Sequence, residues 1–124
     1  DFRELKEIGK DIEAENEQLK IGGTYDHNFV INGDGLREAA VLQSKESGIR
    51  MTCFTDQPGV QLYVPCYTLH QKGIDGKDYP PYSAVCLETQ HYPNAINIEH
   101  FPSVVLKAGE NFRSKTLYHF SVMG

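Results

Sequence analysis

The sequence contains no apolar run approaching the ~18 residues that a transmembrane helix requires. It also lacks a charged and hydrophobic leader at its start and has no Asn-x-Ser/Thr acceptor site. Basic residues are few, with 12 lysines and arginines against 17 aspartates and glutamates, which gives a formal net charge of −5. Phosphate binding requires basic side chains gathered on one face. We therefore expect no membrane partner and no nucleic-acid partner.

Cysteine is scarce as well: the chain has only Cys53, Cys66 and Cys86. An odd number of widely spaced cysteines matches neither a disulfide framework nor a paired cysteine metal site. We therefore expect reduced thiols and a cytoplasmic location.

The composition is that of a soluble globular domain, with 40% hydrophobic and 23% charged residues. A length of 124 residues suits one domain, or one piece of a larger domain, better than two. The first residue is Asp1 and not methionine. From this we expect the natural N-terminus to be missing or processed.

The pattern of apolar residues predicts an all-β fold. A short surface helix is expected within residues 11–20, ended by the glycine pair Gly22-Gly23. After it, short apolar runs alternate with turn residues, as in a β-sandwich or barrel. We expect strands at residues 27–31, 38–43, 50–55, 60–64, 83–89, 103–106 and 115–122, with residues 38–43 and 50–55 forming a hairpin.

The segment at residues 84–97 carries an ionisable residue at the end of an apolar strand. Glu88 follows the apolar residues 84–87 and precedes Thr89, Gln90 and His91. A carboxylate at the rim of an apolar strand is expected to be partly desolvated, which would suit a general base. The alternative is an ordinary solvated glutamate at a sheet edge.

Two further segments could bind a sugar. Asp26 lies in a polar run that follows the glycine pair, and its carboxylate could accept hydrogen bonds from vicinal hydroxyls. Gln61 alternates with apolar neighbours and shares a strand face with Tyr63, whose ring could cover the C–H face of a sugar. Turn formation is the alternative role for Asp26, and an outward-facing pair is the alternative for Gln61.

Together the three segments resemble the aldose 1-epimerase (mutarotase) family. The resemblance is carried by Tyr25-Asp26-His27-Asn28-Phe29, Gln57-Pro58-Gly59-Val60-Gln61 and Leu87-Glu88-Thr89-Gln90, and it continues to Tyr118-His119-Phe120-Ser121. Several separated motifs in one order are far more specific than any one of them. One departure is Thr24, which stands between Gly23 and Tyr25 where the family runs glycine directly into tyrosine.

The resemblance implies that residues 1–124 are the C-terminal portion of a single aldose 1-epimerase domain. The implied fold is part of a large antiparallel β-sandwich, the galactose mutarotase-like supersandwich, which is incomplete without an upstream N-terminal segment. By the same resemblance Glu88 is the catalytic base, Asp26 and Gln61 bind the substrate, and no metal or cofactor is needed. The substrates implied are aldohexoses such as galactose and glucose.

The resemblance also implies that the catalytic acid is absent from this chain. In the family the acid is a histidine that lies upstream of the segment matched by Asp1. We therefore expect an isolated fragment to be inactive and to fold stably only with the complementary N-terminal segment.

Three alternatives remain open. A non-catalytic carbohydrate-binding module could use the same Asp26 and Gln61. A metal site could be built from Cys86, Glu88, His91 and His100, although the surrounding segment is predicted to be strand and loop. A sugar-phosphate epimerase would need a cluster of Arg or Lys near the site, and none of the three segments contains one.

Overall fold

The computed structural model describes residues 1–67 and 69–124, which form two compact units. Each unit combines two separated stretches: residues 1–27 with 62–86 in the first unit, and residues 28–61 with 87–124 in the second. No helix in the described part of the chain is both long and apolar enough to cross a membrane.

The helical part of the first unit consists of the 3₁₀-helix η1 (Ile8–Asp11) and the α-helix α1 (Glu17–Gly22). The side chain of Asn16 caps α1 by accepting a hydrogen bond from Gln18 N at 2.9 Å. Gly23 ends the helix in the left-handed region, at φ 67°, where glycine is favoured. The predicted end of the helix is thus confirmed. Its predicted start is wrong, because the Asn16 cap lies five residues after the Asp11 chosen from sequence.

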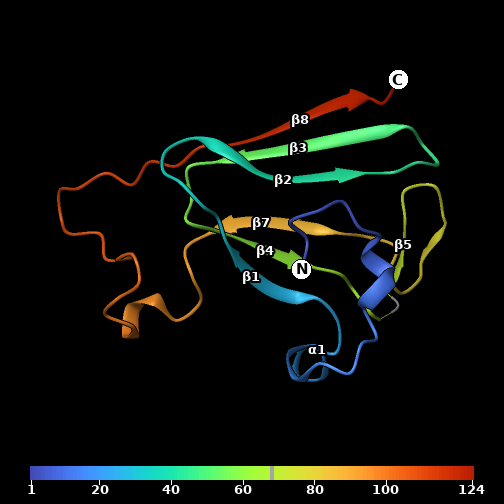
Figure 1. Cartoon of the computed structure of the whole chain (residues 1–124), viewed down its shortest axis with the longest axis horizontal. Helices are drawn as coiled ribbons and strands as arrows, with labels where there is room; N and C mark the ends of the chain where they lie inside the picture. Colours follow the sequence, from blue (N-terminus) through green and yellow to red (C-terminus); the bar gives the residue numbers. More distant parts are fainter. Residues whose placement is uncertain (68) are drawn as a thin grey trace. The chain divides into compact units, whose positions relative to one another are not determined.

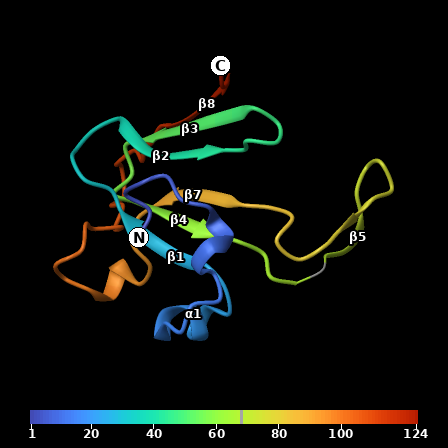
Figure 2. The ribbon, with the colours of Figure 1, turned by 45° about the vertical axis from the view of Figure 1, so that its right-hand side comes forward.

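The first unit also contains a hairpin that the sequence pattern did not reveal. Strands β5 (Leu69–Lys72) and β6 (Asp78–Tyr79) pair antiparallel around a tight turn (Figure 2). Gly73 N donates to the Lys77 carbonyl at 2.8 Å across this turn.

One three-stranded sheet has the order β1-β4-β7, with β1 at Asp26–Val30, β4 at Gly59–Tyr63 and β7 at Cys86–Gln90 (Figure 1). In the first unit Val64 N donates to the Tyr25 carbonyl, and in the second Ile31 N donates to the Pro58 carbonyl, both at 2.9 Å. Residues 28–30, 59–61 and 87–90 of these strands belong to the second unit, and their remaining residues belong to the first.

The other three-stranded sheet lies wholly in the second unit and has the order β2-β3-β8 (Figure 1). Its strands are β2 (Arg37–Gln43), β3 (Ile49–Thr55) and β8 (Thr116–Val122). All neighbouring strands in it are antiparallel, and the hairpin between β2 and β3 is confirmed. Gly48 closes the hairpin turn with φ 70° and donates its N–H to the Ser44 carbonyl at 2.9 Å.

The core of the second unit is formed by residues of β3 and β4. Cys53 and Thr55 of β3 are fully buried, and Val60 of β4 is buried. In the first unit the buried apolar side chains are Tyr25, Leu62 and Val64. The all-β prediction is therefore confirmed, with most of the predicted strands within one residue of their observed bounds.

Two strand predictions need correction. Residues 103–106 form no strand, and Val104, Val105 and Leu106 are exposed in the loop that precedes β8. Apolar residues form a strand only where a neighbouring strand can pair with them, and no described strand pairs with this segment. The strand predicted at residues 83–89 begins only at Cys86.

Candidate functional site

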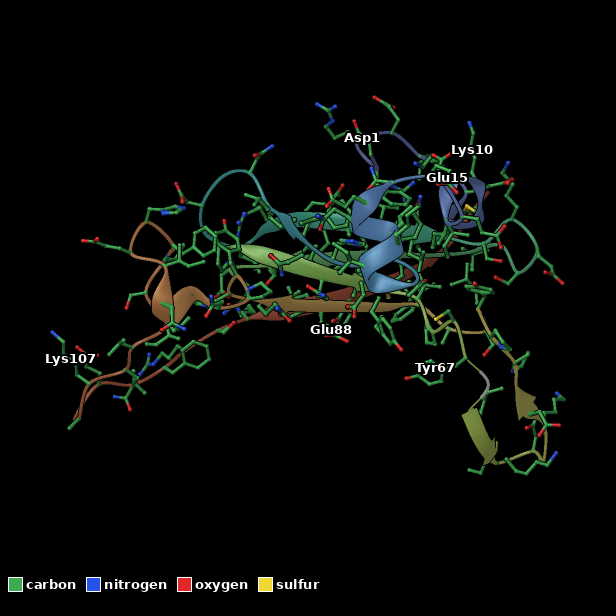
Figure 3. All side chains as sticks on the ribbon, turned by 90° about the horizontal axis from the view of Figure 1, so that it is seen from below. Asp1, Lys10, Glu15, Tyr67, Glu88 and Lys107 are labelled. Carbon is green, nitrogen blue, oxygen red and sulfur yellow. The ribbon has the colours of Figure 1, made fainter. Side chains whose placement is uncertain are left out.

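Glu88 occupies the centre of β7, and its side chain is exposed (Figure 3). Successive residues of a strand point to opposite faces, so Leu87 and Thr89 lie on the face opposite Glu88. The other four residues of β7 are half-buried, and Glu88 alone is exposed. The expectation of a partly desolvated Glu88 is therefore wrong for the described chain, because its side chain is exposed.

Strand β8 contacts β7 immediately before and after Glu88. The hydroxyl of Tyr118 donates a hydrogen bond to the Leu87 carbonyl at 2.8 Å. The hydroxyls of Thr89 and Thr116 lie 2.5 Å apart. All of these residues belong to the second unit, and sequence reasoning assigned no role to either residue of β8.

Thr116 also lies close to a residue of the core. Its hydroxyl oxygen lies 3.3 Å from that of the fully buried Thr55. Thr55 in turn accepts a hydrogen bond from Gln57 N at 3.0 Å. The threonine hydroxyls of β7, β8 and β3 thus form a continuous chain.

Burial raises the pKa of the Tyr118 hydroxyl, and the nearby Cys53 and Glu88 raise this pKa further. A neighbouring negative charge disfavours the phenolate. The hydroxyl of Tyr118 therefore remains a protonated donor to Leu87 at neutral pH.

Gln61 lies on β4, the strand next to β7 in the sheet, so the second unit holds Gln61 and Glu88 on neighbouring strands. It is half-buried, and alternation places it on the face opposite the buried Val60. Ile31 N bonds to the Pro58 carbonyl, and an antiparallel register continued from this bond puts Asn28 opposite Gln61.

The carboxamide of Asn28 was missed by sequence reasoning. Its Oδ1 and Nδ2 atoms are buried and have no hydrogen-bond partner among the described residues. It packs against Gly59, where an added Cβ would overlap the Asn28 oxygen. Asn28 stands in one of the motifs that carry the family resemblance, but no residue pattern distinguished it from the neighbouring polar residues.

Asp26 belongs to the first unit, where it begins β1 with an exposed side chain. Its backbone N–H donates to His27 Nδ1 at 3.1 Å, and His27 Nε2 lies 3.2 Å from the Gln18 carbonyl. This pairing makes Nδ1 the acceptor and Nε2 the donor. His27 therefore connects the start of β1 to α1, which gives it a structural role.

Two further hydrogen bonds in the first unit lie next to β1 and β4. The hydroxyl of the buried Thr24 donates to the Val64 carbonyl at 2.9 Å. Tyr63 donates a hydrogen bond to the Tyr67 hydroxyl at 2.9 Å. This bond, with desolvation and the charges of nearby groups that include Asp26, raises the pKa of Tyr63 to about 12.

The alternative metal site at Cys86, Glu88, His91 and His100 is not found: in the described part of the chain, no three or more His, Cys, Asp or Glu residues are grouped so that they could hold a metal ion. All three cysteines are free, with Cys53 buried.

The family model for aldose 1-epimerase matches residues 1–119 of this chain. The chain belongs to the aldose 1-epimerase family. Curated relatives of this family include galactose mutarotase from Bos taurus, 40% identical over 126 residues, and from Homo sapiens, 37% identical over 126 residues. Each alignment covers 98% of this chain and 35% of the relative. An aldose 1-epimerase from Haemophilus influenzae is 28% identical over 122 residues, which cover 97% of this chain and 35% of that protein.

A solved aldose epimerase family structure agrees with the fold. The crystal structure of a GalM/aldose epimerase homologue from C. elegans matches with a TM-score of 0.73 and 30% sequence identity. The match covers 81% of this chain and 30% of the C. elegans chain. This chain thus has a fold found within a larger aldose epimerase protein, and it spans about a third of the length of the curated relatives that it matches.

Proposed function

We propose that this chain supplies the base and part of the sugar-binding site of an aldose 1-epimerase. The observation that carries the proposal is the family match over residues 1–119, which includes the strands bearing Asp26, Gln61 and Glu88. In the proposal Glu88 is the catalytic base, and Asp26 and Gln61 hydrogen-bond to sugar hydroxyls. Their positions on strands, two of them exposed or half-buried on neighbouring β4 and β7, support this assignment.

The proposed reaction interconverts the α and β anomers of an aldohexose such as galactose or glucose. Glu88 removes the proton from the C1 hydroxyl while an acid protonates the ring oxygen, so that the C1–O5 bond breaks and a carbonyl forms at C1. Rotation about the C1–C2 bond and the reverse proton transfers close the ring on the other face. Each positioned proton transfer contributes roughly 10²–10⁴-fold to the rate, and the reaction needs no metal and no cofactor.

We assign the acid to a histidine in a complementary N-terminal segment, the part of the family length that these residues do not match. Exposed apolar surface in the second unit supports such a partner. It includes Phe120 and Val122 on β8, and Val105 and Phe112 in the preceding loop. In the proposal this chain and the complementary segment belong to one domain, and the three free cysteines fit a reducing cytoplasmic location.

The test uses a hybrid protein in which this chain is joined to the part of bovine galactose mutarotase that it does not match. Polarimetry of freshly dissolved α-galactose and α-glucose measures mutarotation by the hybrid and by the chain alone. We expect the hybrid to accelerate mutarotation and Glu88→Gln to reduce kcat by roughly 10²–10⁴-fold. The matched control is Glu38→Gln, which alters another exposed strand glutamate on β2.

The same assay tests the alternative function, a non-catalytic carbohydrate-binding module. The open setting of Glu88, without the desolvation expected of a base, favours this alternative. Sugar binding by a folded hybrid without acceleration would support the module. Full activity of the Glu88→Gln hybrid would contradict the assignment of Glu88 as the base.

A further inference from the structure

The carboxylate of Glu88 depends on its strand for its position, because its side chain is exposed while the other residues of β7 are half-buried. A base must hold its oxygen within hydrogen-bonding distance of the proton that it removes. A displacement of about 1 Å can cost on the order of 10²-fold in rate. Whatever fixes the backbone of β7 at Glu88 therefore affects catalysis directly.

Two residues of strand β8, which belongs to the other sheet, contact this part of β7. Tyr118 bonds the carbonyl of Leu87, the residue before Glu88, at 2.8 Å. Thr116 contacts the side chain of Thr89, the residue after Glu88, at 2.5 Å. Tyr118 and Thr116 are two residues apart on β8, so they lie on the same face of that strand. Two residues of β8 thus contact β7 on either side of Glu88.

The anchoring strand β8 is itself held by β3 at both of these residues. Thr116 and Tyr118 pair with Thr55 and Cys53 of β3 in the antiparallel register, and both β3 residues are fully buried. The Thr116 hydroxyl also lies 3.3 Å from the Thr55 hydroxyl. The position of β7 is therefore tied to the most buried part of the second unit.

We infer that Thr116 and Tyr118 are positioning residues that hold Glu88 through the backbone and side chain of its two neighbours. The inference rests on the proposed function, because the position of Glu88 matters for the reaction only if Glu88 is the base. The hydroxyl of Tyr118 acts as a donor to Leu87, and the Thr116 hydroxyl connects Thr89 to Thr55. Neither residue touches the substrate or exchanges a proton with it.

The experiment removes each hydroxyl in the hybrid protein by Tyr118→Phe and Thr116→Val. We expect kcat to fall by roughly 10- to 100-fold with KM nearly unchanged, because sugar binding by Asp26 and Gln61 remains. Thr116→Ser keeps a hydroxyl and should restore kcat. Matched controls are Tyr79→Phe on β6 and Thr52→Val on β3, which should leave kcat unchanged.

A second measurement separates positioning from general stability. Hydrogen–deuterium exchange should accelerate at the amides of β7 in Tyr118→Phe and Thr116→Val, while the amides of the β2–β3 hairpin keep their protection. Uniform acceleration through both sheets would overturn the inference, since the hydroxyls would then act on the whole fold.

The outcomes also distinguish this inference from the proposed function. Loss of kcat in Glu88→Gln with unaltered kcat in both hydroxyl variants would overturn the positioning role alone. Unaltered kcat in Glu88→Gln would overturn the base assignment and the positioning role together. A kcat loss in all three variants, with rescue by Thr116→Ser and local exchange at β7, would support both.

Discussion

At the scale of single residues, Asn28 and Gly59 show how tightly the second unit is packed around its polar strand faces. A Cβ at Gly59 would overlap the carboxamide oxygen of Asn28 and lie 3.2 Å from its Cγ and Nδ2 atoms. A side chain at position 59 would therefore force the Asn28 carboxamide, whose two polar atoms are buried, to shift. Glycine at position 59 avoids this overlap between β1 and β4.

The first prediction follows from this contact. Gly59→Ala should lower the free energy of unfolding of the hybrid by about 1–3 kcal/mol, the usual cost of overpacking, as measured by urea denaturation. Shortening the neighbour in Asn28→Ala/Gly59→Ala should recover part of this loss. Identical urea midpoints for Gly59→Ala and the unsubstituted hybrid would contradict the steric account.

The three cysteines differ in reactivity by their burial, which gives the second prediction. Burial raises the pKa of the Cys53 thiol and removes it from solvent, whereas Cys66 and Cys86 are partly exposed. Because the thiolate is the reactive form, a maleimide should label Cys66 and Cys86 in the folded hybrid and reach Cys53 only after unfolding. Mass spectrometry of the labelled peptides measures this. Labelling of Cys53 as fast as of the other two would show that β3 is not packed as described.

At the scale of elements, Asp56 forms hydrogen bonds with the two residues that precede β8. The Asp56 carboxylate accepts hydrogen bonds from Ser114 Oγ at 2.9 Å and from Lys115 N at 3.0 Å. The bond from the Lys115 backbone, with the Ser114 bond and the charge of Arg37, holds the pKa of Asp56 below its usual value of 3.8. Asp56 follows β3 and thereby places the first residue of β8, Thr116, opposite Thr55.

The third prediction concerns the pH dependence of this contact. A carboxyl whose pKa is lower in the folded state stabilises the fold above its unfolded pKa, and this contribution is lost as the pH falls below about 3.8 toward the folded value. Asp56→Asn should therefore reduce thermal stability at pH 7 and flatten the acid-side decline of the melting temperature. Circular dichroism melts from pH 7 to pH 2.5 measure the effect, with Asp34→Asn, an exposed loop substitution, as the control. Parallel curves for Asp56→Asn and the unsubstituted hybrid would contradict it.

The elements that could be predicted from sequence are those whose pattern is local. The hairpin of β2 and β3 has apolar strands on each side of a turn with a glycine at φ 70°, and both strands and turn were found. The residues at 103–106 have the same apolar character but no described strand beside them, so their composition misled the prediction. The short β5 and β6 depend on each other across a turn and carry no alternating pattern of their own.

Some residues of the candidate site could also be proposed from the sequence, and others could not. Asp26, Gln61 and Glu88 were proposed because they stand in motifs that resemble a known family, and the structure has each of them on a strand. Whether they perform the assigned roles remains the proposal tested above. Thr116 and Tyr118 could not be found, because their contacts with β7 join residues 27 and 31 positions apart in sequence. Such contacts follow from the pairing of sheets and not from local pattern.

At the scale of the whole molecule, β8 presents an edge to solvent. It is the last strand in the order β2-β3-β8, and no further described strand pairs with it. All but the first of its seven residues are exposed, with Phe120 at 63% and Val122 at 81%. An exposed apolar edge strand is a template for pairing with another chain.

The last prediction concerns how this edge behaves with and without the complementary segment. In sedimentation velocity the chain alone should self-associate, because its edge and apolar residues lack a partner, whereas the hybrid should sediment as a discrete species. Val122→Lys places a charge on the edge and should reduce self-association of the chain alone. Ile74→Lys, which changes a fully exposed residue in the β5–β6 turn, is the matched control and should not. A chain that sediments alone as a monomer and unfolds cooperatively would show that residues 1–124 complete their own fold, and the proposed need for a complementary segment would then be wrong.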